Sequence, residues 1–354
     1  MRLTLLVPEL IWPEPNDQLT LGKLAAPGFE WLAAHAEFSR RPRQAFEHTL
    51  AAQFGLDDAP FGALRLLGEA NTYQPGDGHW LCADPVHLRF HHERIVLADA
   101  GAFELEPEEA HAITGALNTE FADIGRFHVA TARRWYLQLN TTPQGHFFQG
   151  AVNEKFVPLS TIAGRRLDSD LTDKNGPLNR WLNEVQMFLH GHPVNERRQA
   201  EGKPAVNSLW LWGGGPLPEM PTPTISAVCS DNPLATGMAL AADIEALPCP
   251  DNLSALLADA TPNDNPLVVL DNLLPPVLYE NSEDWRNAWA ALDNNWFMPL
   301  RAALGGKVDT LTIVAPTIYG LLSWTVHGKD RWKFWRKARP LQAIAKELAE
   351  GTTP

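Results

Sequence analysis

Cysteine is scarce in this chain. Three cysteines occur among 354 residues, Cys82, Cys229 and Cys249, and their spacing is wide and unpatterned. A disulfide framework or a structural zinc site needs paired ligands at suitable spacing, so the sequence predicts neither. This sparing use of cysteine is typical of a reducing compartment, and we predict a cytoplasmic protein.

Long apolar runs are also missing. No stretch reaches the length of uninterrupted apolar sequence that a membrane helix requires. The apolar residues 3–7 are followed by Pro8 and Glu9, without the small-residue cleavage site of a signal peptide. We therefore expect no membrane span and interpret residues 3–7 as a first buried strand.

Positive charge is in deficit. The chain has 29 Lys and Arg against 42 Asp and Glu, a formal net charge of −13. Phosphate backbones favour clustered Lys and Arg, so we predict no specific nucleic-acid binding.

One segment departs from this acidic composition. Between residues 329 and 339, basic side chains interleave with Trp332, Phe334 and Trp335. Two interpretations are open: a basic helix that lies on an acidic body with its tryptophans half buried, or a surface that docks on a partner. An exposed apolar patch around Trp324, Trp332 and Trp335 would favour the second.

Short apolar segments alternate with helical patterns along much of the chain. Residues 3–7, 267–270 and 311–314 have the character of buried strands in a parallel sheet. We predict an α/β protein with a mostly parallel central sheet. Apolar periodicity predicts helices over residues 28–35, 42–54, 106–121, 178–190, 285–304 and 341–348.

The middle of the chain has a different pattern. Residues 87–97 and 134–139 are strand-like with mixed polarity, which favours an antiparallel sheet with one solvated face. We place a smaller α+β insertion domain at residues 72–175. The α/β main domain then comprises residues 1–71 and 176–354.

Two tryptophans and three glycines mark one further strand. Trp210 and Trp212 share a strand face, as core residues or as a ligand platform. The amides of Gly213, Gly214 and Gly215 are candidates for binding an anion. The Lys-Ser/Thr pair that completes a nucleotide-binding P-loop is absent after them.

Four histidines fall within fourteen positions, at His79, His87, His91 and His92. On an extended strand, His87 and His91 share a face with Glu93, because side chains alternate. These three are candidate catalytic residues, as a general base or as metal ligands. The alternative is that they are solvated or hydrogen-bonded residues on the wet face of the sheet.

The order of these segments resembles that of the archaeal-type cofactor-independent phosphoglycerate mutases, members of the alkaline-phosphatase superfamily. The resemblance is carried by His192-Pro193-Val194-Asn195 and by residues 207–215, which are similar to the family's His-Pro-Val-Asn and Trp-Leu-Trp-Gly-x-Gly stretches. It covers most of the chain in patches. It implies an alkaline-phosphatase-like sandwich, and it makes His192 and Asn195 candidate ligand-binding residues.

Two arginines are also candidates through this resemblance. The family has an arginine that meets the substrate phosphate at a position comparable to Arg133 and Arg134. An arginine fork suits this role because it pairs two oxygens at once. Adjacent strand residues point to opposite faces, so only one of the two reaches a given site. A surface salt bridge is the plainer interpretation for either.

Three further segments, 84–88, 134–137 and 183–187, resemble more closely bacterial proteins described as RpfE-type regulatory proteins. These are shorter relatives of the mutases. The resemblance implies a regulatory protein without naming its biochemical activity.

The mutase reaction needs a hydroxyl nucleophile and two divalent metals. The resemblance aligns the family's first metal aspartate with Glu9, which makes Glu9 a candidate metal ligand, and it places the family's serine near Ala59. Asp271 follows a buried strand without the expected histidine, and residues 315–317 replace the last Asp-His pair. No Asp-His pair occurs anywhere in the sequence.

We therefore expect a non-catalytic regulatory or binding protein on a phosphoglycerate-mutase-like scaffold. Its partner would be a small phosphorylated or carboxylated metabolite or a protein, and we expect no cofactor. One alternative is a metal-dependent phosphoglycerate mutase or phosphatase that uses non-standard ligands, with Mn or Zn. A second is a protein-interaction module that acts through the Trp-rich basic C-terminus.

Overall fold

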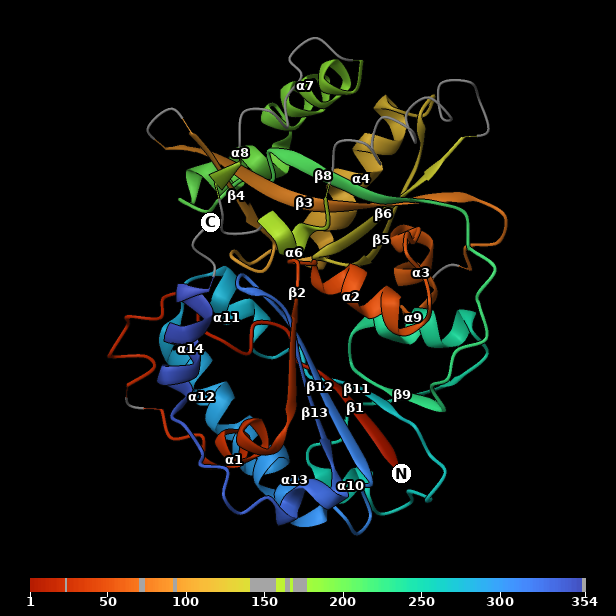
Figure 1. The fold of residues 1–354 in the computed structure, drawn as a ribbon. Helices are drawn as coiled ribbons and strands as arrows, with labels where there is room; N and C mark the ends of the chain where they lie inside the picture. Colours follow the sequence, from red (N-terminus) through yellow and green to blue (C-terminus); the bar gives the residue numbers. More distant parts are fainter. Residues whose placement is uncertain are drawn as a thin grey trace. The chain divides into compact units, whose positions relative to one another are not determined.

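The computed structural model describes residues 1–22, 24–69, 74–91, 94–140, 157–162, 166–167 and 177–351. The chain forms two compact units, shown as a ribbon in Figure 1. The first comprises Met1–Asp57 and Met220–Pro354, and the second comprises Asp58–Glu219. Nowhere in the described ranges does a helix combine the length and the apolar content needed to cross a membrane.

A seven-stranded sheet forms the centre of the first unit (Figure 1). The strands from β10 to β12 are parallel, whereas β13 and β2 continue the sheet in antiparallel fashion. The three strands predicted from apolar runs are confirmed as β1, β11 and part of β12, and the predicted α/β fold with a mostly parallel sheet is confirmed with them. The strand order is β10 (Glu245–Leu247), β9 (Ala227–Cys229), β11 (Leu267–Val269), β1 (Arg2–Leu6), β12 (Thr310–Thr317), β13 (Gly320–His327) and β2 (Glu37–Arg41).

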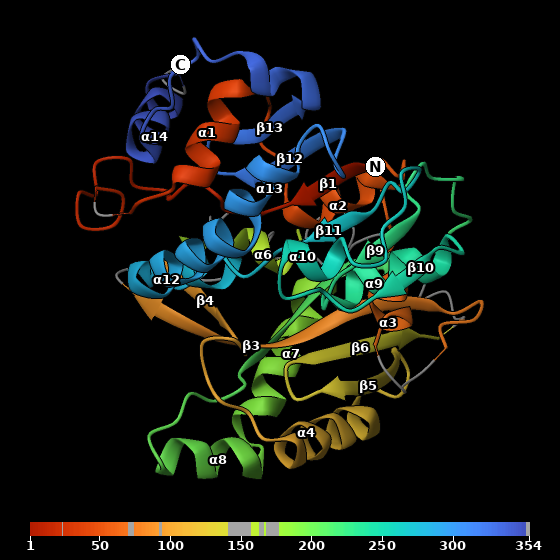
Figure 2. The ribbon, with the colours of Figure 1, turned by 90° about the horizontal axis from the view of Figure 1, so that it is seen from below.

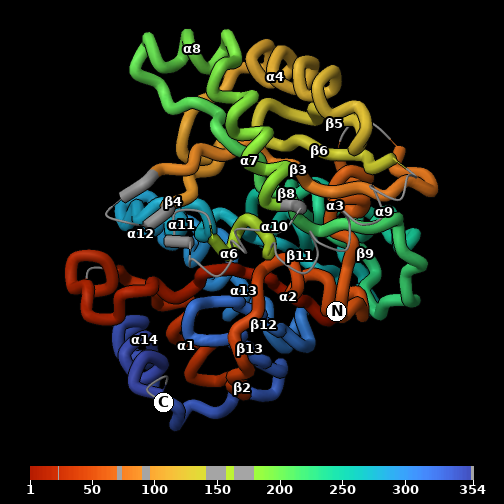
Figure 3. The backbone as a smooth tube through the Cα atoms, turned by 90° about the horizontal axis from the view of Figure 1, so that it is seen from above, coloured from red at the N-terminus to blue at the C-terminus, as the bar shows by residue number. Residues whose placement is uncertain are grey.

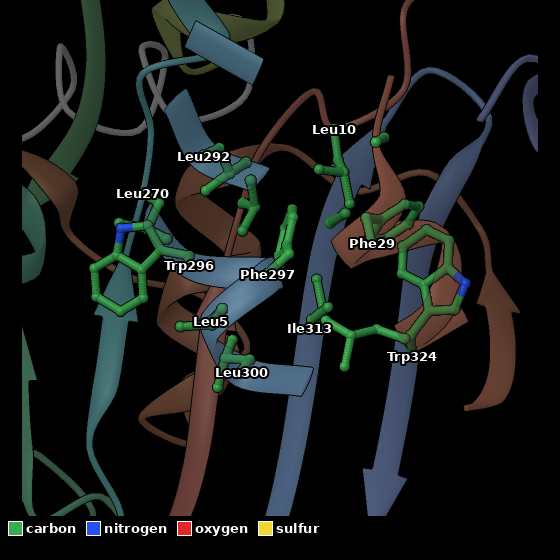
Figure 4. Close-up of a cluster of buried hydrophobic side chains, with 14 of the residues drawn as sticks. Leu5, Leu10, Phe29, Leu270, Leu292, Trp296, Phe297, Leu300, Ile313 and Trp324 are labelled. Carbon is green, nitrogen blue, oxygen red and sulfur yellow. The ribbon is translucent and has the colours of Figure 1, made fainter. Parts of the chain in front are cut away.

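Both faces of β1 are buried, as expected for a central parallel strand. Leu5 and Leu6 point to opposite faces, and neither is accessible to solvent. Figure 4 shows Leu5 and Ile313 of the sheet in one apolar cluster with Phe297 and Leu300. Helices that contribute to this core include α1 (Pro27–His35), α10 (Leu253–Leu256), α12 (Ser282–Leu292), α13 (Met298–Ala303) and α14 (Leu341–Glu350).

The helix predicted over residues 285–304 is interrupted. A π-helical turn, Asp293–Phe297, separates α12 from α13. Pro299 has no N–H to continue a regular α-helical ladder at this point. The buried Asp293 carboxylate accepts hydrogen bonds from the N–H groups of Gly28 (3.1 Å) and Phe29 (2.9 Å). The turn therefore fixes the N-terminal end of α1.

The predicted helix over residues 42–54 is also shorter in the structure. It begins later, as α2 (Phe46–Gln53), and the edge strand β2 precedes it. β2 is largely exposed and lacks the apolar alternation that identifies a half-buried strand, so its sequence gave no strand signal. The remaining helices of this unit are α9 (Pro233–Ala241) and α11 (Leu274–Leu278).

The second unit contains an antiparallel sheet, as the mixed polarity of its segments predicted. The run over residues 87–97 is divided between two strands that pair as a hairpin, β3 and β4. The sheet has the order β5 (Gly125–Thr131), β6 (Arg134–Leu139), β3 (His79–His91), β4 (Arg94–Asp99) and β7 (Arg166–Leu167), with β8 (Ser208–Gly215) paired to β3.

Helices cover both faces of this antiparallel sheet. In Figure 2, α4 and α8 lie on one side of the sheet and α3 on the other, and Figure 3 shows α4 alongside β5. The apolar cluster under α4, α7 and α8 includes Leu81, Trp135 and Leu211. Among its described residues, the helices of this unit are α3 (Phe61–Leu67), α4 (Pro107–Glu120), α6 (Leu159–Ile162), α7 (Pro177–His190) and α8 (Pro193–Ala200).

The division between the units differs from the predicted domain boundaries. The second unit begins at Asp58 and ends at Glu219, whereas the insertion was placed at residues 72–175. The physical reason is that β8 hydrogen-bonds along β3, and α3 packs on both of these strands. The segment with the two tryptophans and three glycines is therefore part of the antiparallel unit.

Candidate functional site

The carboxyl ends of the parallel strands in the first unit meet at one edge of its sheet. In α/β sheets this edge is where side chains from successive strands converge on a ligand. Here Glu9 follows β1, Asp231 follows β9, Cys249 follows β10 and Asp271 follows β11. We refer to these four residues and their neighbours as the carboxyl edge, and it is the candidate site.

Glu9 has a fixed and unusual backbone. Its φ angle is 55°, which is uncommon for a residue with a Cβ, and its side chain is only 7% exposed. Its N–H donates to the carbonyl of Pro316 (2.9 Å), and its own carbonyl accepts from Trp285 Nε1 (3.1 Å). Trp289 Nε1 fixes the next residue by donating to Leu10 O (2.8 Å). These contacts hold a carboxylate where the resemblance implies a metal ligand.

Tyr319 lies within the electrostatic influence of Glu9. Its hydroxyl donates to the backbone carbonyls of Trp12 (3.2 Å) and Pro13 (2.7 Å). Burial, together with the Glu9 and Glu14 carboxylates, raises the pKa of Tyr319 to about 12. The phenol is therefore neutral at ordinary pH, and it serves as a hydrogen-bond donor to the loop after β1.

A second polar group lies at the ends of β9, β10 and β11. Asn232 Nδ2 donates to Asp271 Oδ2 (2.8 Å), and Asp231 Oδ1 accepts from the N–H of Cys249 (3.1 Å). Burial raises the pKa of Asp271. Burial and the nearby Asp231 carboxylate raise the pKa of the Cys249 thiol to about 12. A thiol held in its protonated form is a poor nucleophile.

These side chains do not form a metal centre within the described residues. No group of three or more His, Cys, Asp and Glu side chains there is arranged to hold a metal ion. The carboxylate of Glu9 helps to raise the pKa of Tyr319, whereas that of Asp231 helps to raise the pKa values of Asp271 and Cys249. The donor set at the edge consists of carboxylates, an amide and a protonated thiol, so it does not fit a two-metal phosphotransfer centre.

Trp210 and Trp212 are buried in the second unit, which confirms the core interpretation. Trp212 Nε1 donates to Asp84 Oδ2 (2.8 Å), and Trp210 Nε1 donates to Val157 O (2.9 Å). Neither indole presents a free face for a ligand platform, because Trp210 and Trp212 are only 5% and 3% exposed.

A buried ion pair that sequence reasoning missed lies beside these tryptophans. Arg65 Nη1 and Nη2 donate to the two oxygens of Asp84 (3.0 and 2.6 Å), and Arg65 Nε donates to the hydroxyl of Tyr136 (2.9 Å). The Tyr136 hydroxyl in turn donates to Glu69 Oε1 (2.7 Å). The sequence did contain a signal for this pair: Arg65 is the one charged residue of an apolar helix, and Asp84 lies in an apolar stretch of a strand.

The two arginine candidates have different environments. Arg134 makes a bidentate ion pair with Glu69, through Nε (2.6 Å) and Nη2 (2.9 Å). Arg133 is exposed in the turn between β5 and β6. The structure thus gives Arg134 the salt bridge that was the plainer interpretation, and a phosphate contact by Arg133 stays a prediction.

The His-Pro-Val-Asn motif holds the second unit together. His192 is the N-cap of α8, and its Nδ1 accepts from the N–H of Val194 (3.2 Å). Asn195 is fully buried, and its Nδ2 donates to the carbonyls of Leu189 (2.7 Å) and Val206 (2.8 Å). The motif links α7 and α8 to the chain that enters β8, and ligand binding by either residue stays a prediction.

The histidine group is only partly within the described structure. His87 Nδ1 lies 2.8 Å from the carbonyl oxygen of Ala205, in line with the hydrogen-bonded alternative for this residue. His91 belongs to β3, but the placement of its side chain is not described, and His92 and Glu93 lie outside the described residues. A joint site of His87, His91 and Glu93 therefore stays a prediction.

The glycines after Trp212 permit a close approach of β8 to the start of α3. Gly213 has a φ angle of 64°, and a Cβ there would lie 2.6 Å from the Cβ of Phe61. A Cβ on Gly215 would lie 2.6 Å from the Cβ of Pro60. The positive φ angles and the close packing together explain why Gly213 and Gly215 need to be glycine. Anion binding by the amides of Gly213, Gly214 and Gly215 stays a prediction.

Gly213→Ala is expected to destabilise the protein by about 1–2 kcal/mol, from the left-handed backbone alone. Gly115→Ala, at an exposed position in α4 with nothing near the added methyl, is the matched control and should be neutral or stabilising. Denaturant titration of both variants measures the difference. A Gly213→Ala variant as stable as the control would contradict the packing role.

Comparison with known proteins places this arrangement in a wider class. The mixed α/β fold is similar to the solved structure of the PH0037 protein from Pyrococcus horikoshii, with a TM-score of 0.55, 15% identity, and coverage of 99% of this chain and 98% of that one. At this level of identity the likeness concerns the fold. A search against protein-family models found no match.

Sequence similarity to curated proteins indicates which kind of scaffold this is. The chain is 31% identical over 132 residues to the 2,3-bisphosphoglycerate-independent phosphoglycerate mutase of Pyrococcus horikoshii. The matched stretch covers 36% of this chain and 32% of the relative. The chain is 30% identical over 175 residues to the enzyme of that name from Methanosarcina acetivorans, 48% of this chain and 41% of the relative. The matches thus span about a third to two fifths of these relatives. The chain has a phosphoglycerate mutase-like scaffold.

Proposed function

We propose that this chain is a non-catalytic regulatory or binding protein built on a phosphoglycerate mutase-like scaffold, of the kind that RpfE-type regulatory proteins represent. One observation carries the proposal: at the carboxyl edge Asp271 accepts a hydrogen bond from Asn232 and Asp231 accepts one from the backbone of Cys249, and the described residues hold no group of three or more His, Cys, Asp and Glu arranged around a metal position. Its ligand would be a small phosphorylated or carboxylated metabolite or a protein.

The chemistry of the nucleophiles supports the same proposal. Phosphoryl transfer through a covalent intermediate needs a hydroxyl or thiol that a base or a metal activates. Ala59, near the position where the resemblance places the family's serine, is buried and has no hydroxyl. At the carboxyl edge, burial and neighbouring carboxylates raise the pKa of both Cys249 and Tyr319, which opposes activation. An enzyme on this scaffold would need a nucleophile from elsewhere.

Metal content and turnover test the proposal directly. The full chain would be purified without chelators, analysed for metals, and assayed for interconversion of 3- and 2-phosphoglycerate with added Mn²⁺ or Zn²⁺. We expect no stoichiometric metal and no turnover. A melting temperature that rises with 3-phosphoglycerate alone would indicate binding without catalysis, since a ligand of the native state stabilises it. Stoichiometric metal together with turnover would contradict the proposal.

Asp271→Asn distinguishes a half-buried structural carboxylate from a metal ligand. Burial raises the pKa of Asp271 above its ordinary value of 3.8, so the folded state binds a proton more tightly than the unfolded state does. The stability that this provides is present at low pH and is lost as pH rises through the folded-state pKa. We therefore expect the variant to be more stable than the parent at pH 7, with the difference vanishing below pH 3.8.

Thermal melting of both proteins across this pH range measures the effect. Asp259→Asn removes an exposed carboxylate from the same unit and controls for the change in net charge. A variant of Asp271 that loses bound metal, or that melts below the parent at pH 7, would point to a ligand role instead.

A further inference from the structure

The segment from Lys329 to Arg339, here called the aromatic-cationic segment, is not the half-buried helix of one sequence interpretation. Its first residues complete a 3-10 turn, Gly328–Trp332, and no α-helix follows until α14 (Figure 2). Trp332, Phe334 and Trp335 are 65%, 86% and 67% exposed, whereas Trp324 is buried in β13. The first interpretation is wrong, and three large aromatic side chains project from the surface.

Backbone contacts hold this segment against the first unit. Arg336 Nη1 donates to the carbonyls of Ala34 (3.2 Å) and Ala36 (3.0 Å). Asp330 is buried, and its carboxylate accepts from the N–H of His327 (2.9 Å) and pairs with Lys333 Nζ (2.7 Å). The rings are thus presented by an anchored loop.

The charge of the segment is opposite to that of the chain. Its six basic residues are Lys329, Arg331, Lys333, Arg336, Lys337 and Arg339. Its single acidic residue, Asp330, is buried against Lys333, in a chain of net charge −13. The first unit therefore carries a local cationic surface on an otherwise acidic protein.

A groove beside the segment has the same mixture of chemistry. It has a volume of about 420 Å³ and an apolar floor that includes Phe38, Trp324 and Ile344. Arg336, Lys337 and Arg339 line it together with Glu30 and Glu347, and Arg339 pairs with Glu347 (2.5 Å). Apolar surface thus lies directly next to the cations.

These features fit an anionic lipid surface. Lys and Arg attract anionic headgroups, while Trp and Phe enter the interfacial layer, where an apolar ring and a polar N–H are both satisfied. A deformable lipid layer accommodates three projecting rings, whereas a folded acidic partner needs a matching pocket for each.

We propose that the aromatic-cationic segment is a peripheral anchor that docks the first unit on an anionic lipid surface. Trp332, Phe334 and Trp335 enter the interfacial layer, and the surrounding cations contact the headgroups. This inference does not depend on the absence of catalysis proposed above, and the metal and turnover assays do not affect it.

Vesicle binding by the full chain tests the anchor. Sedimentation with vesicles of phosphatidylcholine and phosphatidylglycerol in equal parts should recover the protein, and vesicles of phosphatidylcholine alone should recover much less. Replacement of Trp332, Phe334 and Trp335 by alanine should weaken binding more than about tenfold. Lys329→Gln with Lys337→Gln should weaken it about fivefold per charge, since each cation near the surface contributes about one kilocalorie per mole.

Matched controls remove similar groups elsewhere. Leu19→Ala with Leu247→Ala removes exposed apolar side chains, and Arg126→Gln with Lys203→Gln removes exposed cations. Both controls should bind as the parent does, and all variants should keep its melting temperature because the replaced side chains are exposed. Brominated lipid should quench tryptophan fluorescence in the parent more than in a Trp332→Phe, Trp335→Phe variant.

Three results would overturn the inference. The first is no recovery with the anionic vesicles. The second is vesicle binding that survives loss of the three aromatic side chains, because the attraction would then be purely electrostatic. The third is binding of poly-glutamate, in place of vesicles, that depends on the same aromatic and basic residues, which would assign the surface to an acidic protein segment.

Discussion

Asp84→Ala is expected to lower the free energy of unfolding of the second unit by about 3–5 kcal/mol, because it leaves a buried guanidinium without its partner. The Arg65 and Asp84 side chains are 9% and 2% exposed, and their closest N–O distance is 2.6 Å. Burial opposes the charge of Arg65, but Asp84, Cys82 and Tyr136 together outweigh it, so that the pKa of Arg65 is raised. The loss of Asp84 also removes the acceptor of Trp212 Nε1.

Guanidinium titration of the variant measures this cost. Asp77→Ala, at an exposed position in the same unit, is the charge control. Replacing both partners by apolar residues, Arg65→Met with Asp84→Leu, should recover much of the loss, because no unpaired charge then stays buried. If Asp84→Ala cost no more than the control, the pair would not be desolvated in solution.

Mild acid is expected to destabilise the second unit through His128. Burial, followed by the positive charge of Arg126, lowers the pKa of His128 from 6.5 to about 4. The unfolded chain therefore binds a proton between these values while the folded chain does not. Stability is complete above pH 6.5 and falls as pH drops toward 4, by about 2–3 kcal/mol at pH 4 for a shift of this size.

His128→Gln tests this pH dependence. The variant keeps a neutral side chain beside Trp80, whose ring centroid lies 5.1 Å from that of His128. The difference between the denaturation midpoints at pH 7 and pH 5 should be smaller in the variant than in the parent. His111→Gln, on the exposed face of α4, should leave the loss unchanged. A variant that weakens in acid as much as the parent would show that other groups cause the loss.

Local sequence patterns predicted much of the first unit. The buried strands at residues 3–7, 267–270 and 311–314 were found because central parallel strands are short, apolar and β-branched. The edge strand β2 was missed because it is mostly exposed and shows no apolar alternation. The break between α12 and α13 was missed because Asp293 contacts Gly28 and Phe29, which lie 265 and 264 positions away in the sequence.

Some features of the candidate site could also be predicted from the sequence, whereas others required the structure. The absence of an Asp-His pair is a property of the sequence and needed no structure. The placement of a carboxylate at Glu9 followed from its position after the first strand. The bonds of Asn232 to Asp271 and of Asp231 to Cys249 depend on which strands are neighbours, and the sequence does not encode that order locally.

By itself, the sequence determined the α/β class, the short parallel strands and the absence of an Asp-His pair. These follow from periodicity and residue chemistry, which act over a few neighbouring positions. Only the tertiary structure decided that Arg65 pairs with Asp84, that Arg134 pairs with Glu69, and that the rings of the aromatic-cationic segment face solvent. The reason is physical: the partner of a charge and the covering of an apolar ring come from residues distant in sequence, which meet only when the chain is folded.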